Sequence, residues 1–439
     1  MTSSKPAIAY LTAGAGGMLC GSCLHDNTLA RALIRRGVDT HLIPTYTPIR
    51  TDEENVSQER VFLGGINLFL SQKVPGYRHL PGFLTGMLNR PSLIRWATRR
   101  ASATSAQSLG ALTVSMLRGT AGFQRREMEE LCQWLATDLR PDLVVLSNAL
   151  IAGCVPRIKE ILKVPVLATL QGDDIFLESL PEPYRSQSLF EIRRLVGSID
   201  GFLVNSRYYA DFMREYFEIP APKIHRVPLG LDVSHFPSPA EFDAWAKHGE
   251  SRAPRIGYLA RLAPEKGLHV LIDAFIELRS RENGMRPQLS VAGWLGEHNR
   301  PYVVQQRMKI RAAELEFDTQ WVGEVDRQGK IEFLRQLDLL SVPTTYAEPK
   351  GLYVLEALAA GVPVVQPDHG AFPELLAVTG GGELVPPNHP SKLADAIESL
   401  IKDEPRRRQL GRTGQLAVHQ KFNADAMADA TWEVMKQFL

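Results

Sequence analysis

Short apolar runs recur along the chain, and each is followed by a stretch in which apolar residues return at helical spacing. In the first half the runs cover residues 7–12, 40–44, 143–147, 166–170 and 201–205. After residue 250 the rhythm begins again, with runs at 255–259, 288–292, 319–322, 339–343, 362–366 and 382–385. Strands that alternate with amphipathic helices are typical of parallel sheets with crossover helices. The pattern therefore predicts two α/β domains.

Two segments interrupt this rhythm. Residues 219–239 are rich in proline, which breaks both periods, and we expect the linker between the domains there. Residues 60–126 have a helical and loop-like pattern, and we interpret them as an elaboration of the first domain. The predicted domains are residues 1–230 and residues 231–424.

Composition and charge describe an ordinary globular protein. The chain has 439 residues, a net charge of +1, 44% hydrophobic residues and 23% charged residues. These values exclude a peptide-sized or disulfide-stapled protein and give no indication of a nucleic-acid partner. The average nevertheless hides an asymmetry, because residues 60–126 hold ten Lys or Arg and no Asp or Glu. The rest of the chain is therefore net acidic.

The cysteines and apolar runs bear on location. Four cysteines in so long a chain are too few for a disulfide framework, and neither a signal peptide nor an apolar run of the roughly 18 residues that span a bilayer is apparent. We expect a cytoplasmic protein whose contact with the inner membrane surface, if any, is peripheral. Cys20-x-x-Cys23 suits a redox or metal site, but no second Cys pair with zinc-ligand spacing accompanies it. We predict neither metal nor cofactor.

The most informative stretch is residues 348–361, where Glu348 and Glu356 stand eight positions apart around a predicted helix start. Helix propensity rises at Leu352, and Gly361 is a typical residue just past a helix end. Glu348 then lies in the loop before the helix and Glu356 inside it, so both can face one site. The first amides of that helix, from Gly351, Leu352 and Tyr353, favour a phosphate. For such a pair alone, a solvated Glu on an ordinary helix is the alternative.

A second motif, residues 257–268, takes a strand into a loop that carries Arg261 and Lys266. Both motifs are similar to the signatures of family 4 retaining glycosyltransferases, in which Glu-x7-Glu is followed by an Ala-Leu-Ala-Ala-Gly-Val-Pro-Val-Val-like run. The resemblance implies the GT-B fold, in which two Rossmann-like domains face each other across a cleft that holds the active site. It also implies that a C-terminal helix, residues 425–439, packs back on the first domain.

The resemblance implies transfer of a sugar from a UDP, GDP or ADP sugar to an acceptor, with retention of configuration and without a metal. Arg261 and Lys266 would stabilise the diphosphate as it leaves, and Gly16 and Gly17 would let the backbone of the first domain approach it. Either cation alone would be an ordinary solvated side chain. The leaving phosphate would take the proton of the acceptor, so no protein nucleophile is assigned.

By the same resemblance, Glu356 accepts hydrogen bonds from the ribose hydroxyls and Glu348 lies at the donor sugar, beside the reacting carbon. Both roles suit ionised carboxylates, which only accept hydrogen bonds. The absence of any Asp-x-Asp tripeptide agrees with metal-independent chemistry.

In the first domain, the chain departs from the family pattern in two places. Many relatives have a His where this chain has residues 171–174, Gln-Gly-Asp-Asp, and Asp173 either orients a substrate hydroxyl or serves a cap or turn. The first loop is also longer, and we interpret His25, Asp26 and Asn27 as contacts to the acceptor or donor sugar. Capping of the following helix by Ser22 or Asp26 is the equal alternative.

The acid-free segment indicates an anionic or membrane-surface acceptor, with Arg95, Arg99 and Arg100 as its basic cluster. Pairing of these side chains with the acidic remainder of the protein is the alternative. The same motifs are also compatible with three other functions: a sugar-nucleotide epimerase or a glycoside phosphorylase of related fold, or a catalytically silent protein that binds nucleotide sugars.

Overall fold

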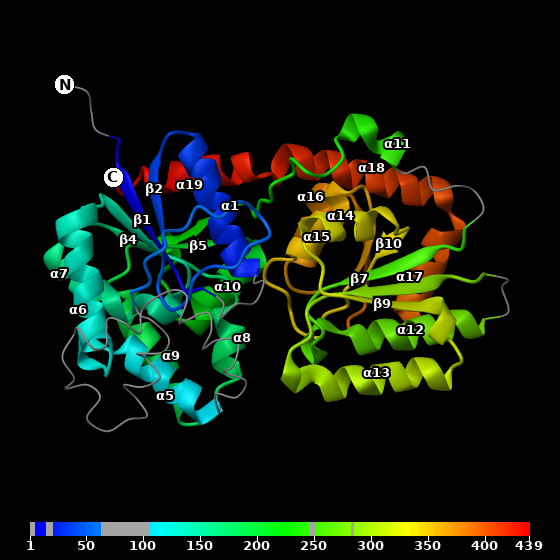
Figure 1. Ribbon diagram of the computed structural model, residues 1–439, viewed down its shortest axis with the longest axis horizontal. Helices are drawn as coiled ribbons and strands as arrows, with labels where there is room; N and C mark the ends of the chain where they lie inside the picture. The colour runs from blue at the N-terminus through cyan, green and yellow to red at the C-terminus, as the bar shows by residue number, and fades with distance from the viewer. Residues whose placement is uncertain (1–4, 15–20, 63–105, 246–251, 282–284) are drawn as a thin grey trace. The chain divides into compact units, whose positions relative to one another are not determined.

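The computed structural model describes residues 5–14, 21–62, 106–245, 252–281 and 285–439. The chain divides into two compact units, Met1–Pro228 with Met427–Leu439, and Leu229–Ala426. Each unit is built on one six-stranded sheet in which every strand pair is parallel (Figure 1). The predicted α/β class is therefore confirmed.

The first sheet has the strand order β2-β1-β3-β4-β5-β6. Its strands are β1 (Ala7–Thr12), β2 (Asp39–Pro44), β3 (Leu143–Leu146), β4 (Val166–Thr169), β5 (Gly201–Val204) and β6 (Ile224–Arg226). Strands β3, β4 and β5 are buried throughout, as apolar runs covered on both faces should be. The apolar runs predicted five of these strands to within a residue.

Strand β6 corrects the linker prediction. It lies inside the proline-rich interval 219–239, yet it pairs in parallel with β5 from Phe202↔Ile224 to Val204↔Arg226. Residues 224–226 contain no proline, so their amides are free to join the edge of the sheet. The interval 219–239 is therefore not linker throughout.

Helices cover both faces of this sheet (Figure 1). One face carries α1 (Gly21–Arg35) and the C-terminal α19 (Ala424–Met435). The other carries α5 (Ala106–Leu117), α6 (Arg125–Trp134), α7 (Val155–Ile161), α8 (Asp173–Glu178), α9 (Tyr184–Val196) and α10 (Arg207–Tyr216). Because α1 begins at Gly21, Ser22 and Asp26 lie inside the helix, and the prediction that one of them caps it is wrong.

The C-terminal segment packs against the first sheet through few but specific contacts. Val434 clusters with Leu203 of β5 and with Val227. Arg36, just past α1, forms an ion pair with Asp429 of α19. The helix ends at Met435 rather than at the predicted residue 439.

The second sheet has the order β12-β11-β10-β7-β8-β9. Its strands are β7 (Arg255–Leu259), β8 (Gln288–Ala292), β9 (Thr319–Gly323), β10 (Leu339–Leu340), β11 (Val364–Pro367) and β12 (Gly382–Val385). Strand β10 is shorter than the apolar run 339–343 predicts. Residues 341–351 consequently form a loop at the carboxyl edge of the sheet.

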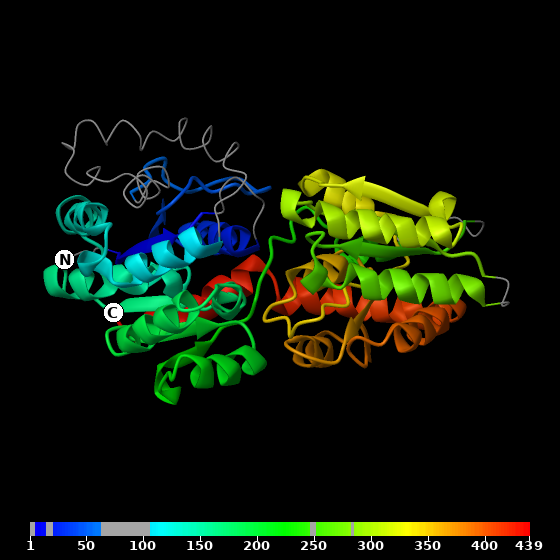
Figure 2. The same cartoon turned by 90° about the horizontal axis from the view of Figure 1, so that it is seen from below.

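The helices of the second unit are α11 (Phe242–Trp245), α12 (Leu268–Ser280), α13 (Arg300–Ala312), α14 (Arg327–Arg335), α15 (Leu352–Ala359), α16 (Phe372–Thr379), α17 (Pro390–Lys402) and α18 (Glu404–Lys421). Helices α12 and α13 share one face of the sheet and lie in front of it in Figure 2. Helices α15 and α18 cover the opposite face (Figure 1). None of the helices in the described ranges combines the length and the apolar character that crossing a bilayer requires.

The strand order of each sheet reverses at one point, between β1 and β3 in the first and between β7 and β10 in the second. Right-handed crossovers then send the connections of the two neighbouring strands to opposite faces. The loops at their carboxyl ends separate and leave room for a ligand, which is where open parallel sheets bind one. The fold therefore directs attention to the loops after β7 and β10, and after β1 and β3.

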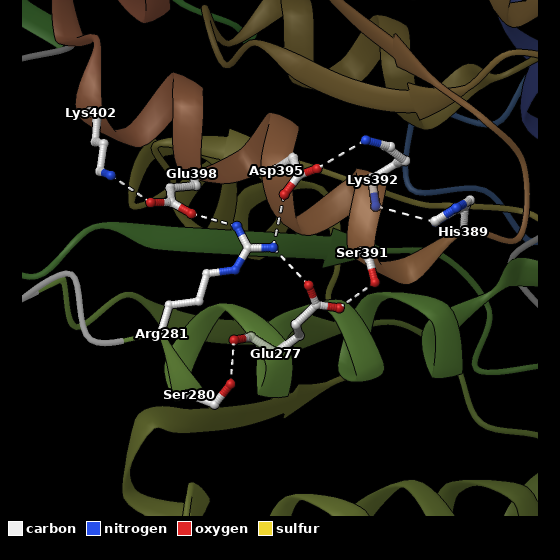
Figure 3. A network of polar contacts seen from close by, with 9 residues as sticks. All are labelled: Glu277, Ser280, Arg281, His389, Ser391, Lys392, Asp395, Glu398 and Lys402. Atoms are coloured by element: carbon white, nitrogen blue, oxygen red, sulfur yellow. Dashed lines mark hydrogen bonds and ion pairs between the residues drawn. The ribbon is translucent and has the colours of Figure 1, made fainter.

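An ion-pair network joins α12 to α17 (Figure 3). The Arg281 guanidinium donates to the carboxylates of Glu277 at 2.7 Å, Asp395 at 2.9 Å and Glu398. Glu277 also accepts a hydrogen bond from the Ser391 hydroxyl at 2.6 Å, across the two helices. Arg281 thus links three carboxylates, two of which also pair with a lysine, Asp395 with Lys392 and Glu398 with Lys402.

Replacing Arg281 with Ala should lower the free energy of unfolding by about 1 kcal/mol, because the three carboxylates lose their shared cation. Urea unfolding of the full chain measures this, and high salt should shrink the difference. The matched control is Arg300→Ala, since Arg300 and its partner Glu297 are both more than 60% exposed and lie within one helical turn. Equal stability of the two variants would show that the network contributes nothing.

Candidate active site

The loops after β7 and β10 are locked together at the point where the strand order reverses. The amide of Thr345 donates to the carbonyl of Glu265 at 3.0 Å. Gly267 has a φ of +72°, and a Cβ there would lie 1.7 Å from the carbonyl oxygen of Pro343. Only glycine allows this approach, so the loop that carries Lys266 is fixed against the loop that carries Glu348.

Lys266 and Glu348 form a buried ion pair between these loops. The Lys266 ammonium lies 2.7 Å from Oε2 of Glu348, and the side chains are 12% and 7% exposed. The same oxygen accepts hydrogen bonds from the hydroxyls of Tyr346 at 2.7 Å and Tyr353 at 3.2 Å. The ammonium also lies over both tyrosine rings, 4.9 Å and 5.5 Å from their centroids. The two tyrosines therefore hold both members of the pair.

The surroundings keep Glu348 ionised. Burial alone would raise the pKa of its carboxyl group, but the Lys266 charge and hydrogen bond, the Tyr346 hydroxyl and the Lys350 charge outweigh burial and lower the pKa to about 2. Burial and the Glu348 charge raise the pKa values of Tyr346 and Tyr353, which stay protonated as donors. The site therefore contains a carboxylate that stays ionised at neutral pH and is bonded to the Lys266 side chain.

The backbone of Glu348 is fixed by the loop that follows β11. The amide of Ala371 donates to the Glu348 carbonyl at 2.8 Å. Gly370 has a φ of +61°, and a Cβ there would lie 2.6 Å from the backbone nitrogen and oxygen of Glu348. Loops after three neighbouring strands thus set the position of this one carboxylate.

Glu356 forms a second ion pair, with Lys330. Its Oε1 accepts a hydrogen bond from the Lys330 ammonium of α14 at 2.7 Å, and both side chains are largely buried. No contact joins Glu348 to Glu356 within the part of the chain that the structure describes. Glu348 and Glu356, which are close in sequence, therefore belong to two separate carboxylate–ammonium pairs, one with Lys266 and one with Lys330. The two pairs lie on either side of the start of α15.

The predicted helix between them is confirmed. Helix α15 begins at Leu352 after Gly351, whose φ is +75°, and Gly361 adopts a φ of +77° beyond its end. The first amides of α15, from Leu352 and Tyr353, have no preceding turn of helix to bond to. These amides make the N-terminal end of α15 a site for an anion, next to the loop that carries Glu348.

Arg261 is more accessible than Lys266. Its side chain is 47% exposed and pairs with Glu265 at 3.2 Å. The Tyr258 hydroxyl bridges the carbonyls of Arg261 and Lys266, at 3.1 Å and 3.3 Å, and so closes the loop between them. Arg261 and Lys266 therefore belong to one rigid turn.

Sequence reasoning missed two residues of this site, Tyr346 and Lys330. Tyr346 precedes Glu348 by two positions in the same loop, and this proximity was the available signal. Lys330 belongs to no motif, because its role depends on how α14 packs beside α15. Only the three-dimensional structure reveals it.

In the first unit, Asp26 is the centre of a buried cluster at the ends of β1 and β4. Its Oδ1 accepts hydrogen bonds from the Tyr10 hydroxyl at 3.0 Å and the Gln171 amide at 2.9 Å, and its Oδ2 accepts one from Thr12 at 2.8 Å. His25 Nδ1 lies 3.2 Å from Oδ1. The Asn27 amide bonds the backbone of residues 54–56. All three predicted acceptor residues are thus buried, and contact with an acceptor stays a prediction.

Asp173 is also buried, and its carboxylate binds backbone amides. Oδ1 accepts from the amide of Ala149 at 2.7 Å, and Oδ2 accepts from that of Gln171 at 2.9 Å. Burial raises the pKa of this carboxyl group to about 6 despite these bonds. Gly172 precedes α8, so Asp173 is the first residue of the helix. Asp173 fixes the chain after β3 and β4, and a role toward substrate stays a prediction.

Some sequence predictions lie outside the described residues: those for Gly16, Gly17, Cys20 and the basic cluster Arg95, Arg99 and Arg100. At the described ends of the basic segment, Arg60 pairs with Glu130 and Arg118 with Glu191. Among the described residues, no group of three or more His, Cys, Asp and Glu side chains is arranged to hold a metal ion.

Family models match both units. The model "Glycosyl transferases group 1" matches residues 241–417, and the model "Glycosyl transferase 4-like domain" matches residues 27–230. D-inositol 3-phosphate glycosyltransferase of Segniliparus rotundus is 28% identical over 70% of this chain and 71% of its own length. Phosphatidyl-myo-inositol mannosyltransferase of Mycobacterium tuberculosis is 29% identical over 44% of this chain, and the match spans only 48% of that protein.

Solved structures agree in fold. Sucrose-phosphate synthase from Thermosynechococcus elongatus has a TM-score of 0.70 at 18% identity and covers 99% of both chains. Anabaena HepE in complex with UDP has a TM-score of 0.67 at 18% identity, over 98% of this chain and 100% of its own. Because the two family models together follow both α/β units, the chain belongs to the group 1 glycosyltransferases, with a glycosyltransferase 4-like first domain and the GT-B fold.

Proposed function

We propose that this glycosyltransferase moves a sugar from a nucleotide-diphosphate sugar to a hydroxyl-bearing acceptor, with retention of configuration and without a metal ion. The observation that carries the proposal is the buried, ionised Glu348 joined to Lys266 beside the start of α15. The HepE structure that this fold resembles contains UDP, which supports a nucleotide-sugar donor.

The donor diphosphate binds Arg261, Lys266 and the amides of Gly351, Leu352 and Tyr353. An ammonium has three N–H donors, and Glu348 and Tyr346 accept two from Lys266. The third is available to a phosphate oxygen. As the bond to the sugar breaks, the diphosphate gains negative charge, which these fixed donors stabilise in place of a metal ion.

Glu348 orients the donor sugar through its second oxygen. Oε2 already accepts hydrogen bonds from Lys266, Tyr346 and Tyr353, whereas Oε1 accepts a long hydrogen bond of 3.4 Å from the amide of Lys350. Oε1 can therefore accept a hydrogen bond from a sugar hydroxyl. Glu356, steadied by Lys330, accepts hydrogen bonds from the ribose hydroxyls.

The acceptor is a polyol that carries an anionic group. The names of two relatives contain D-inositol 3-phosphate and phosphatidyl-myo-inositol, and residues 60–126 of this chain carry ten basic residues and no acidic one. His25, Asp26, Asn27 and Asp173 form the acceptor side of the first unit. The diphosphate takes the proton from the acceptor hydroxyl on the same face of the sugar, which gives retention.

A thermal-shift screen of UDP-, GDP- and ADP-sugars tests the donor. The true donor should raise the melting temperature by a few degrees at saturating concentration, because it binds only the folded protein. Proton NMR of the product should show the anomeric configuration of the donor, and EDTA should leave the rate unchanged. If no nucleotide sugar shifts the melting temperature or is consumed, the proposed function is wrong.

Glu348→Gln should reduce turnover about a hundredfold, because a neutral amide cannot provide the charge that orients and stabilises the reacting sugar. Affinity for the nucleoside diphosphate should change little, as measured by calorimetry. The matched control is Glu332→Gln on α14, an exposed carboxylate that should behave as wild type. Turnover at the wild-type rate in the Glu348 variant contradicts the assigned role.

Lys266→Met should reverse the pH dependence of stability that Glu348 contributes. In the wild type the pKa of the Glu348 carboxyl group lies near 2, below the ordinary 4.5. Its contribution to the free energy of unfolding is therefore fully present above pH 4.5 and is lost as pH falls toward 2. Without the ammonium, uncompensated burial raises the pKa of Glu348. The contribution of Glu348 to the free energy of unfolding then falls as pH rises above 4.5. The difference in free energy of unfolding should therefore grow from about pH 4 to about pH 7, reaching about 3 kcal/mol.

Urea unfolding at several pH values measures this difference. The control is Lys309→Met, which breaks a pair with Asp273 in which both side chains are more than a third exposed. That variant should show a small difference that does not grow over the same range. A flat difference for Lys266→Met would mean that Lys266 does not hold the Glu348 charge.

A further inference from the structure

The buried cluster around Asp26 occupies the carboxyl ends of β1, β3 and β4 in the first sheet. Tyr10 and Thr12 come from β1, and Gln171, which follows β4, donates to both Asp26 and the carbonyl of Ser147 after β3. The strand order reverses between β1 and β3, so this is the ligand-binding edge of an open parallel sheet. His25 is the imidazole of this cluster and is 2% exposed.

Counting donors and acceptors indicates which tautomer the neutral His25 ring adopts. The Asp26 carboxylate only accepts hydrogen bonds, so the ring nitrogen that faces it at 3.2 Å, Nδ1, must carry the hydrogen. In the neutral imidazole the other nitrogen, Nε2, is then an acceptor without a hydrogen. Asp26 itself accepts three further hydrogen bonds, from Tyr10, Gln171 and Thr12.

Nε2 of His25 is buried and has no hydrogen-bond partner among the described residues. A buried polar atom without a partner is costly, and such atoms in native proteins usually bind a ligand or an ordered water. The cluster therefore offers one acceptor atom, held in a fixed orientation at the ligand-binding edge of the first sheet. The group that matches it is a hydroxyl, which donates a single hydrogen bond.

We propose that Nε2 of His25 accepts the hydrogen bond of an acceptor-substrate hydroxyl, and that Asp26 is a positioning residue that holds His25 in the Nδ1–H form. The inference rests on the proposed function and narrows its acceptor side to one atom. Asn27 takes no part in it, since its amide is committed to the backbone of residues 54–56. The ligand class is a neutral hydroxyl of a polyol or sugar.

Nitrogen-15 NMR of the full chain with labelled histidine tests the positioning role. The signal of His25 among the 11 histidines is identified by its loss in His25→Gln. The proposal predicts the Nδ1–H tautomer in the wild type and a shift toward Nε2–H in Asp26→Asn, where the obligate acceptor is gone. An Nε2–H tautomer in the wild type overturns the proposal, whatever the enzyme activity.

Kinetics test the contact with the acceptor. The donor identified by thermal shift is supplied with myo-inositol as the acceptor probe, and in a second series with water alone, which hydrolyses the donor. His25→Phe should lower the rate with either acceptor about tenfold, while the KM of the donor stays within twofold. His25→Gln, which restores an acceptor oxygen, should recover part of the loss, and Asp26→Asn should fall between the two.

The matched control is His41→Gln, because His41 forms a partly exposed pair with Asp39, the first residue of β2. It should leave both rates unchanged, and melting temperatures show whether each variant is folded. Wild-type rates in a folded His25→Phe variant overturn the inference. If the wild type consumes no nucleotide sugar, the proposed function has failed, and the tautomer of His25 still reports on Asp26.

Discussion

The bond between Lys266 and Glu348 is the interaction on which the donor side of this protein depends. Burying either charge alone would cost several kcal/mol, so the site exists only because both are buried together. The fold meets that condition by reversing the strand order between β7 and β10, which places the two loops side by side. Gly267 and Gly370 allow the backbones to come close enough, and Tyr346 and Tyr353 complete the hydrogen bonds.

Three buried carboxylates show how partners decide the chemistry of a site. Glu348 has a cation, and its pKa falls to about 2. Asp173 is bonded to backbone amides without a cation, and burial raises its pKa to about 6. Asp26 is surrounded by neutral donors and fixes the orientation of a histidine. The first provides permanent charge, the second organises backbone, and the third sets a tautomer.

The sequence predicted what local pattern controls. Apolar runs located eleven of the twelve strands, and a helix between Leu352 and Gly361 followed from propensity and a terminal glycine. Prediction from the sequence failed where the length of a strand or the partner of a side chain depends on packing between distant segments. Strand β6 is too short to stand out among prolines, β10 is cut short by the loop that Glu348 needs, and Lys330 reaches Glu356 only because α14 packs beside α15. Sequence spacing also did not reveal that each glutamate has its own lysine partner, Lys266 for Glu348 and Lys330 for Glu356.

We propose that the Lys266–Glu348 pair is a preformed site for the donor diphosphate. A crystal structure of the full chain with the nucleoside diphosphate of the donor would locate that group. We expect phosphate oxygens within hydrogen-bond distance of the Lys266 ammonium, the Arg261 guanidinium and the first amides of α15, with Glu348 still bonded to Tyr346. A diphosphate bound elsewhere, with no contact to Lys266 or the start of α15, would show that the pair has another role.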